Sequence, residues 1–140
     1  MKNWKKMMSA ALTAAMTVTM LAGCGGGETE KGSSDTIKIG GIGPVTGDAA
    51  IYGEAVKNGA ELAVKEINEA GGINGAQIEF NFQDDEADAE KAVNAYNTLK
   101  DWGMQALLGT VTSAPCVAVG EVAQADNMFL LTPSGTAVEC

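Results

Sequence analysis

Residues 37–52, IKIGGIGPVTGDAAIY, begin as a short apolar run and break into a loop rich in glycine. The same change recurs at Ala106–Leu108 before Gly109–Pro115, and at Met128–Leu131 before Thr132–Thr136. If the three runs are parallel strands, their loops gather at the carboxyl edge of one sheet, where open α/β folds bind ligands. The sequence therefore predicts a small-molecule-binding protein.

Amphipathic helical patterns separate these runs at the spacing that βαβ units require. The first helix is predicted to end at Gly71-Gly72, a C-terminal glycine signal. The second helix is closed by Gly103, and Pro115 opens a third that runs to about Asp126. The apolar stripes of the first two helices are Val56, Ala60, Ala63, Val64 and Ile67, and Ala89, Ala92, Val93, Tyr96 and Leu99.

A further strand is predicted between the first two helices, because Ile78, Phe80 and Phe82 alternate with polar residues. Such alternation is typical of a half-exposed strand, so we expect it near an edge of the sheet. The order of elements is then βαβαβαβ, with a fourth helix beginning after Thr136. These patterns predict an α/β fold with a doubly wound, mostly parallel sheet.

The N-terminal segment has the pattern of a secretory signal rather than of a folded element. Lys2, Lys5 and Lys6 precede an apolar stretch from Met7 to Ala22 that contains no acidic residue. This stretch is short and interrupted by Thr, which argues against a membrane span. We therefore expect the protein to be exported.

The end of this segment, Leu21–Cys24, resembles the bacterial lipobox, in which a Cys after small residues receives diacylglycerol. The alternative is a small-residue cleavage site with an incidental Cys. Residues 25–35 are small, polar and charged, which predicts a flexible tether. We therefore expect a lipoprotein signal peptide at 1–24, a tether at 25–35 and a folded part at 36–140. Cys24 would anchor the protein to the outer face of the bacterial cell membrane.

The charge balance excludes several classes of function. Nine basic residues, all Lys, stand against 18 acidic ones, and without the predicted signal peptide the formal charge is −12. Nucleic acid is not an expected partner, because phosphate binding needs clustered Lys or Arg. The chain contains no His, which excludes a Ser-His or Cys-His catalytic pair and leaves too few soft ligands for zinc. We assign no catalytic residue, cofactor or metal.

A run of acidic residues precedes the second predicted helix. Acidic side chains are favoured at a helix N-terminus because they face its partial positive charge, and most charge runs are solvated surfaces. We interpret the run in this way, with a calcium site as the alternative. Its members are Asp84, Asp85, Glu86, Asp88 and Glu90.

The chief rival class is a dinucleotide-dependent enzyme, because Gly41-Ile42-Gly43 follows a predicted strand. The fingerprint fails at its third glycine, where the sequence has Thr46, and Pro44 removes an N–H group from the loop that would hold the phosphate. The glycines alone therefore do not predict a nucleotide site.

Five motifs together resemble the branched-chain amino-acid-binding proteins of ABC importers: Ile37–Tyr52, Ile67–Gly75, Asp84-Asp85, Gly109–Pro115 and Thr132–Glu139. The resemblance implies the two-lobed type I periplasmic-binding-protein fold, of which this chain would hold part of the first lobe. It also implies an extracytoplasmic protein that delivers an amino acid, branched-chain or related, to an ABC importer permease. A ligand-sensing lobe of a receptor or of an amide-responsive regulator is the alternative within the same fold.

The resemblance also assigns ligand-binding roles. Ser113 would donate its hydroxyl to the ligand carboxylate, Ser134 would offer a backbone carbonyl to the ammonium, and Thr136 would contribute a hydroxyl and an N–H. Tyr52 would form an aromatic wall for the side chain. Helix starts after Ser113 and Thr136 can hold an anion without Arg. The alternatives are ordinary helix caps for the three hydroxyl residues and core packing for Tyr52.

Two further cysteines, Cys116 and Cys140, fall in neighbouring carboxyl-edge loops. An exported protein meets an oxidising compartment, so we expect a disulfide between them. Two free thiols packed as small apolar residues are the alternative. In the family that the sequence resembles, some members carry a bridge at positions matching Ala87 and Thr112.

Overall fold

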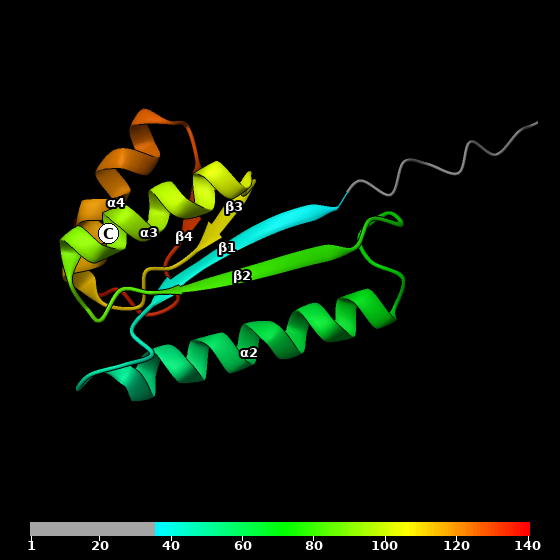
Figure 1. Cartoon of the computed structure of the whole chain (residues 1–140), viewed down its shortest axis with the longest axis horizontal. Helices are drawn as coiled ribbons and strands as arrows, with labels where there is room; N and C mark the ends of the chain where they lie inside the picture. Colours follow the sequence, from blue (N-terminus) through cyan, green and yellow to red (C-terminus); the bar gives the residue numbers. More distant parts are fainter. Residues whose placement is uncertain (1–35) are drawn as a thin grey trace, which may run out of the picture. The chain divides into compact units, whose positions relative to one another are not determined.

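The computed structural model describes residues 36–140 (Figure 1). The predicted signal peptide, Cys24 and the tether lie outside the described residues. The elements in chain order are β1 (Ile37–Gly43), α2 (Ala50–Glu69), β2 (Ile78–Asp84), α3 (Ala89–Trp102), β3 (Ala106–Leu108), α4 (Ser113–Ala125) and β4 (Phe129–Leu131). The predicted order βαβαβαβ is confirmed.

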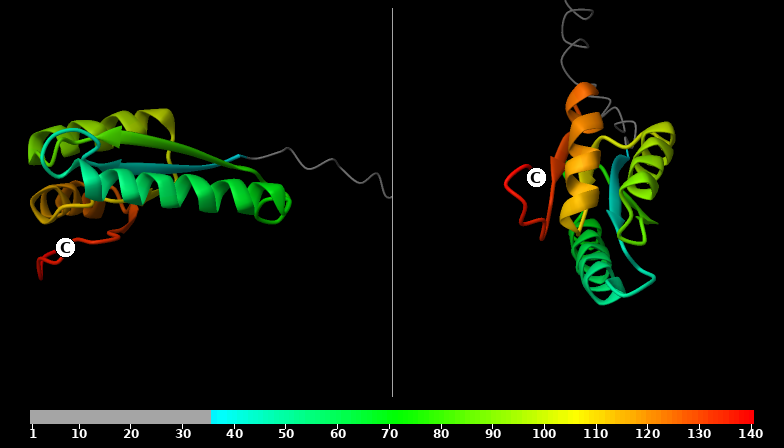
Figure 2. Two further views of the ribbon diagram at one scale, coloured as in Figure 1. Left: turned by 90° about the horizontal axis from the view of Figure 1, so that it is seen from below. Right: turned by 90° about the vertical axis from the view of Figure 1, so that its left-hand side faces the viewer.

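The strands form one parallel sheet in the order β2-β1-β3-β4. β1 pairs with β2 along its whole length, from Ile37 opposite Ile78 to Gly43 opposite Asp84. β2 is an edge strand, as its alternating pattern predicts. α2 contacts β1 and β2 on one face of the sheet, and α3 and α4 pack together on the other (Figure 1). Figure 2 shows that the segment from β4 onward lies at the edge opposite β2.

The core lies between the sheet and the pair α3 and α4. Tyr96 and Leu99 of α3 are fully buried there, against Leu107 of β3. The Tyr96 hydroxyl donates to Asp126 Oδ2 at 3.0 Å, and Lys100 Nζ lies 2.5 Å from the same oxygen. These contacts join α3 to the end of α4, so the buried face of α3 is held by both packing and polar bonds.

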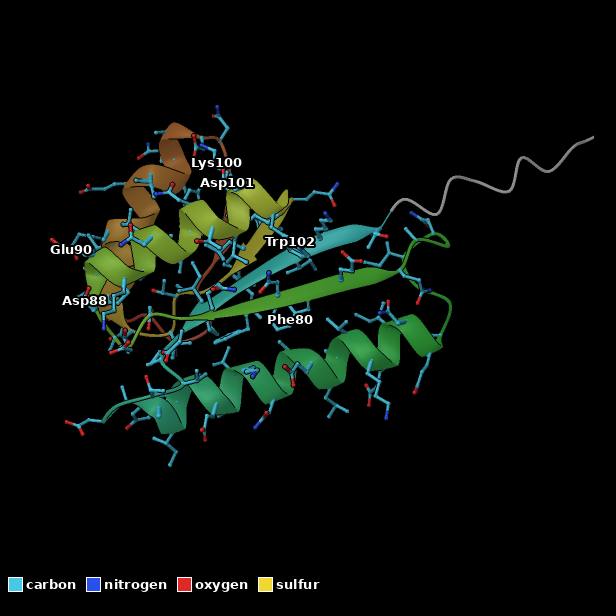
Figure 3. All side chains as sticks on the ribbon, viewed as in Figure 1. Phe80, Asp88, Glu90, Lys100, Asp101 and Trp102 are labelled. Carbon is cyan, nitrogen blue, oxygen red and sulfur yellow. The ribbon has the colours of Figure 1, made fainter. Side chains whose placement is uncertain are left out.

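Local signals in the sequence explain both ends of α3. Asp88 is the N-cap, and its side chain accepts a hydrogen bond of 2.9 Å from the Lys91 N–H. Gly103 ends the helix with a φ of 90°, a left-handed conformation that glycine adopts without strain. Figure 3 shows Glu90 near the start and Lys100 near the end, the charge arrangement that the helix dipole favours.

α2 buries little of its predicted apolar stripe. Gly53 is its one buried residue, and Ile67 remains 37% exposed. An apolar groove of about 260 Å³ lies between α2 and the sheet, lined by residues of all four strands, and Phe129 at its β4 side is 66% exposed. Despite this apolar surface, none of the helices in residues 36–140 is long and apolar enough to span a membrane.

The predicted start of a fourth helix after Thr136 is not observed. Residues 137–140 instead form one turn, closed by a hydrogen bond of 3.1 Å from the Cys140 N–H to the Ala137 carbonyl. This bond reaches back three residues, whereas an α-helix forms bonds four residues apart.

Candidate functional site

The loops after β1, β3 and β4 lie at one edge of the sheet, because parallel strands all end on the same side. These loops are residues 44–49, 109–112 and 132–136. α2 and α4 begin at this edge, so it also receives the positive ends of two helix dipoles. Figure 1 shows it on the left, where β1 ends and α2 begins. The predicted gathering of the loops is confirmed.

Hydrogen bonds join the loop after β4 to the loop after β3. The Ser134 hydroxyl donates to the Val111 carbonyl at 2.7 Å, and the Thr136 N–H donates to Ser113 Oγ at 3.1 Å. The Thr132 hydroxyl, which we did not single out in the sequence, donates to the Thr110 carbonyl at 2.8 Å. The structure therefore brings Ser113, Ser134 and Thr136 into one cluster.

Ser113 is the first residue of α4 and not its cap. The N-cap is Thr112, whose side chain makes no capping bond and whose hydroxyl is buried without a partner in the described residues. Pro115 has no N–H and the Cys116 N–H donates to the Thr112 carbonyl at 3.0 Å, so the N–H groups of Ser113 and Ala114 are the ones without an acceptor within the helix. The Ser113 hydroxyl stands beside these donors, in position to contact an anion there.

Tyr52 lies in the first turn of α2, at the same edge, and its side chain is 64% exposed. This exposure does not agree with core packing, the alternative for this residue. The adjacent Gly53 explains how the turn is held, since a Cβ there would lie 1.7 Å from the Pro44 carbonyl oxygen. Only glycine allows α2 to approach the loop so closely. Within residues 36–140, no hydrogen bond joins Tyr52 to Ser113, Ser134 or Thr136.

The glycines of β1 serve packing between strands. A Cβ on Gly41 would lie 2.4 Å from the Phe82 ring, and one on Gly43 would lie 2.4 Å from a Val111 methyl group. Both positions are filled by side chains of neighbouring segments, which leaves no room for a phosphate against the backbone. The two glycines therefore match part of the dinucleotide fingerprint in sequence but do not form a phosphate-binding site.

The acidic residues around the start of α3 each have a separate local role. Asp88 caps the helix, and Glu86 Oε2 lies 2.6 Å from Lys91 Nζ. Asp85 is fully buried, and burial raises the pKa of its carboxyl group. Among residues 36–140 no three acidic or sulfur side chains lie close enough together to hold a metal ion.

Asp84 binds the loop after β1, a role that the sequence did not suggest. Its Oδ1 accepts from the N–H groups of Val45 and Glu86, both at 2.9 Å, and its Oδ2 accepts from the Thr46 hydroxyl at 2.6 Å. Burial alone would raise the pKa of Asp84, but these hydrogen bonds to the charged form outweigh it and lower the pKa. Two signals in the sequence single out Asp84: its place at the carboxyl end of a strand and its membership of the Asp84-Asp85 motif, and neither indicates which loop it binds.

The arrangement of these loops matches a known family. The family model described as periplasmic binding protein covers residues 36–140. The chain belongs to the periplasmic binding protein family. The predicted α/β architecture is therefore that of an established family.

Two relatives of this chain are named as amino-acid-binding proteins. The leucine-, isoleucine-, valine-, threonine- and alanine-binding protein of Pseudomonas aeruginosa is 39% identical over 107 residues, 76% of this chain and 29% of that protein. A Leu/Ile/Val-binding protein of Rhizobium johnstonii is 40% identical over 101 residues, 72% of this chain and 28% of that protein. These relatives are binding proteins and not enzymes, which is against the dinucleotide-enzyme alternative.

Solved structures share the fold. The substrate-binding protein LivJ of a branched-chain amino acid transporter from Streptococcus pneumoniae, in complex with isoleucine, has a TM-score of 0.70 at 38% identity, covering 74% of this chain and 30% of that chain. A type 1 periplasmic binding protein from Bordetella pertussis has a TM-score of 0.65 at 36% identity, and the match covers 69% of this chain and 26% of that chain. The chain spans less than a third of the length of the relatives it matches.

In this binding protein, Cys116 and Cys140 are both free thiols, the first buried and the second exposed. They are neighbours, since a Cβ on Gly135 would lie 2.9 Å from Cys140 Sγ and 3.4 Å from Cys116 Sγ. Burial and a hydrogen bond with Cys140 raise the pKa of Cys116 to about 11. The disulfide between them stays a prediction.

Proposed function

We propose that this chain forms part of the first lobe of an extracytoplasmic protein that delivers an amino acid with an apolar side chain to an ABC importer. The observation that carries the proposal is the cluster of Ser113, Ser134 and Thr136 at the start of α4. It combines hydroxyl groups, a backbone N–H and free donors of a helix terminus. The amino acids in the names of the relatives support the ligand class.

The cluster suits the carboxylate of an amino acid. The Thr136 N–H donates to Ser113 Oγ at 3.1 Å. A ligand carboxylate would replace Ser113 as the acceptor of that N–H. It would also accept a hydrogen bond from the Ser113 hydroxyl. Together with the free N–H groups at the start of α4, these donors can hold an anion without Lys or Arg.

The remaining groups suit the other parts of the ligand. The backbone carbonyl of Ser134 would accept from the ammonium group, and the exposed ring of Tyr52 would contact an apolar side chain. One lobe provides only one wall of such a site. We therefore propose that a second lobe covers the ligand, and that Cys24 carries the lipid anchor that keeps the protein at the membrane beside its permease.

A thermal-shift screen of the complete two-lobed protein against the twenty common amino acids tests the proposal. We expect leucine, isoleucine or valine to raise the midpoint of unfolding, because a ligand at 100 times its Kd stabilises the folded state by about 2.7 kcal/mol. Leucinol, which lacks the carboxylate, is the matched control and should give no shift. Deleting the gene should also reduce uptake of the same amino acid, whereas a sensor lobe would leave uptake unchanged.

Two results would contradict the proposal. If none of the amino acids shifted the midpoint, the ligand class would be wrong. If leucinol stabilised the protein as strongly as leucine, the carboxylate role of the Ser113 cluster would be wrong, even though an amino-acid side chain was recognised.

A further inference from the structure

The loop between β1 and α2 has few apolar anchors. Pro44 is buried, but Thr46, Gly47 and Asp48 are exposed to solvent. Gly47 has a φ of 76°, and its carbonyl accepts a hydrogen bond of 3.2 Å from the Ala50 N–H. Exposed segments with few buried contacts open easily, so a loop of this kind needs polar bonds to keep one conformation.

Asp84 supplies these polar bonds from the neighbouring strand. Its carboxylate accepts from Val45 and Thr46 in the loop and from Glu86 on its own side, at 2.6 to 2.9 Å. Asp84 is itself fixed, because it ends β2 in register with Gly43 of β1. Hydrogen bonds to an ionised acceptor are among the stronger ones in proteins. The loop is therefore tied to the edge strand of the sheet.

The loop in turn supports the first turn of α2. The Pro44 carbonyl lies where a Cβ of Gly53 would stand, at 1.7 Å, so the backbones of the loop and the helix are in direct contact. Tyr52 is the neighbour of Gly53, and the residue is 64% exposed, so little of its ring is fixed by packing. The place of the ring therefore depends on the loop, and through the loop on Asp84.

We propose that Asp84 is a positioning residue for ligand specificity: by holding Val45 and Thr46 it places Tyr52 against the ligand side chain. This inference rests on the proposed function, because it assumes that Tyr52 contacts the side chain of a bound amino acid. Asp84 itself touches no ligand. Replacing Asp84 should therefore change which amino-acid side chain the protein prefers, while the contacts of the Ser113 cluster with the ligand carboxylate remain.

The test compares leucine and alanine affinities of the two-lobed protein by calorimetric titration. Thr46→Val and Asp84→Asn should each lower the ratio of leucine to alanine affinity by about two- to tenfold, the size of one hydrogen bond. Thr46→Ser keeps the hydroxyl and should restore the wild-type ratio. A variant that only loses stability would lower the affinities for leucine and alanine by the same factor and leave their ratio unchanged.

Two controls separate positioning from charge. Asp101→Asn removes the same charge from the far end of α3, away from the carboxyl edge, and should leave the ratio unchanged (Figure 3). In a Tyr52→Ala background, Asp84→Asn should have no further effect on the ratio, because the residue through which it acts is gone. Independently of any ligand, Asp84→Ala should speed hydrogen exchange of the Val45 amide.

An unchanged ratio in both Thr46→Val and Asp84→Asn, additive effects with Tyr52→Ala, or unchanged exchange at Val45 would each overturn the positioning role. Failure of the wild-type protein to bind any amino acid would instead overturn the proposed function, and the specificity role with it. The two failures are distinguishable, because only the first leaves wild-type binding intact.

Discussion

The hydroxyl oxygen of Ser113 accepts a hydrogen bond of 3.1 Å from the backbone N–H of Thr136. This contact joins the first residue of α4 to the loop after β4. The two groups that the proposed site offers to a carboxylate thus bind each other. A ligand carboxylate that accepted from both groups would replace this hydrogen bond with bonds to itself.

Thr136→Val tests the binding role of this loop. Because Thr136 is exposed, replacing its hydroxyl by a methyl group should cost little folding stability. The loss of a partner for a buried charged ligand group should weaken amino-acid binding by about 1 to 3 kcal/mol, measured by calorimetric titration. Thr98→Val, the same change on an exposed face of α3, is the control and should bind normally. Equal affinities for the two variants would refute the role of Thr136.

Gly53→Ala tests the close approach of α2 to the loop after β1. A Cβ at this position would lie 1.7 Å from the Pro44 carbonyl oxygen, so we expect a loss of about 1 to 3 kcal/mol in the free energy of unfolding. Gly59→Ala in the same helix meets no atom within 4 Å and should stabilise by about 0.5 to 1 kcal/mol. Thermal denaturation measures both, and a stabilised Gly53→Ala would show that the contact is absent.

Cys116 and Cys140 should form a disulfide when oxidised glutathione is supplied. The exposed Cys140 attacks it and releases one glutathione, and Cys116 then displaces the second, so two thiols are oxidised and one disulfide is reduced. The closed loop of about 25 residues should stabilise the fold by about 3 kcal/mol. Thiol counting on denatured, unreduced protein measures the result, with Cys140→Ser as control. If both thiols were free, the disulfide prediction would be wrong and the alternative of two packed free thiols would stand.

Tyr96→Phe tests the buried hydroxyl between α3 and α4. Burial and the hydrogen bond to Asp126 raise the pKa of Tyr96 from 10.0 to about 12. The stability that the Tyr96 hydroxyl contributes is therefore fully present below pH 10 and is lost as the pH rises toward 12. In this range the unfolded chain has already released the tyrosine proton, whereas the folded chain still holds it. The wild-type free energy of unfolding should fall more steeply between these pH values than that of Tyr96→Phe. Identical slopes would contradict the assignment.

Lipidation of Cys24 is the prediction that concerns the N-terminal segment. The sequence Leu21–Cys24 follows a basic and then apolar leader, so we expect covalent attachment of diacylglycerol at the thiol. Metabolic labelling with a radioactive fatty acid should mark the wild-type protein and not Cys24→Ser. The same amount of label in both proteins would rule out the anchor.

The sequence by itself determined the elements and their order. The stripe that includes Tyr96 and Leu99 and the Gly103 that follows it are local signals, and the structure places both where the pattern predicts them. The alternation from Ile78 to Phe82 likewise predicted an edge strand. Local periodicity reports which side of an element is buried, because it depends only on the geometry of one helix or strand.

Tertiary structure alone decided which residues meet. The bonds of Asp84 to Val45 and Thr46 cross 39 and 38 residues of sequence, and the bond from Ser134 to Val111 crosses 23. Asp84 and Asp88 belong to one acidic run, yet one holds a distant loop and the other caps its own helix. Sequence spacing carries no information on such contacts, because strand order and register set the distance between loops that the chain itself keeps far apart.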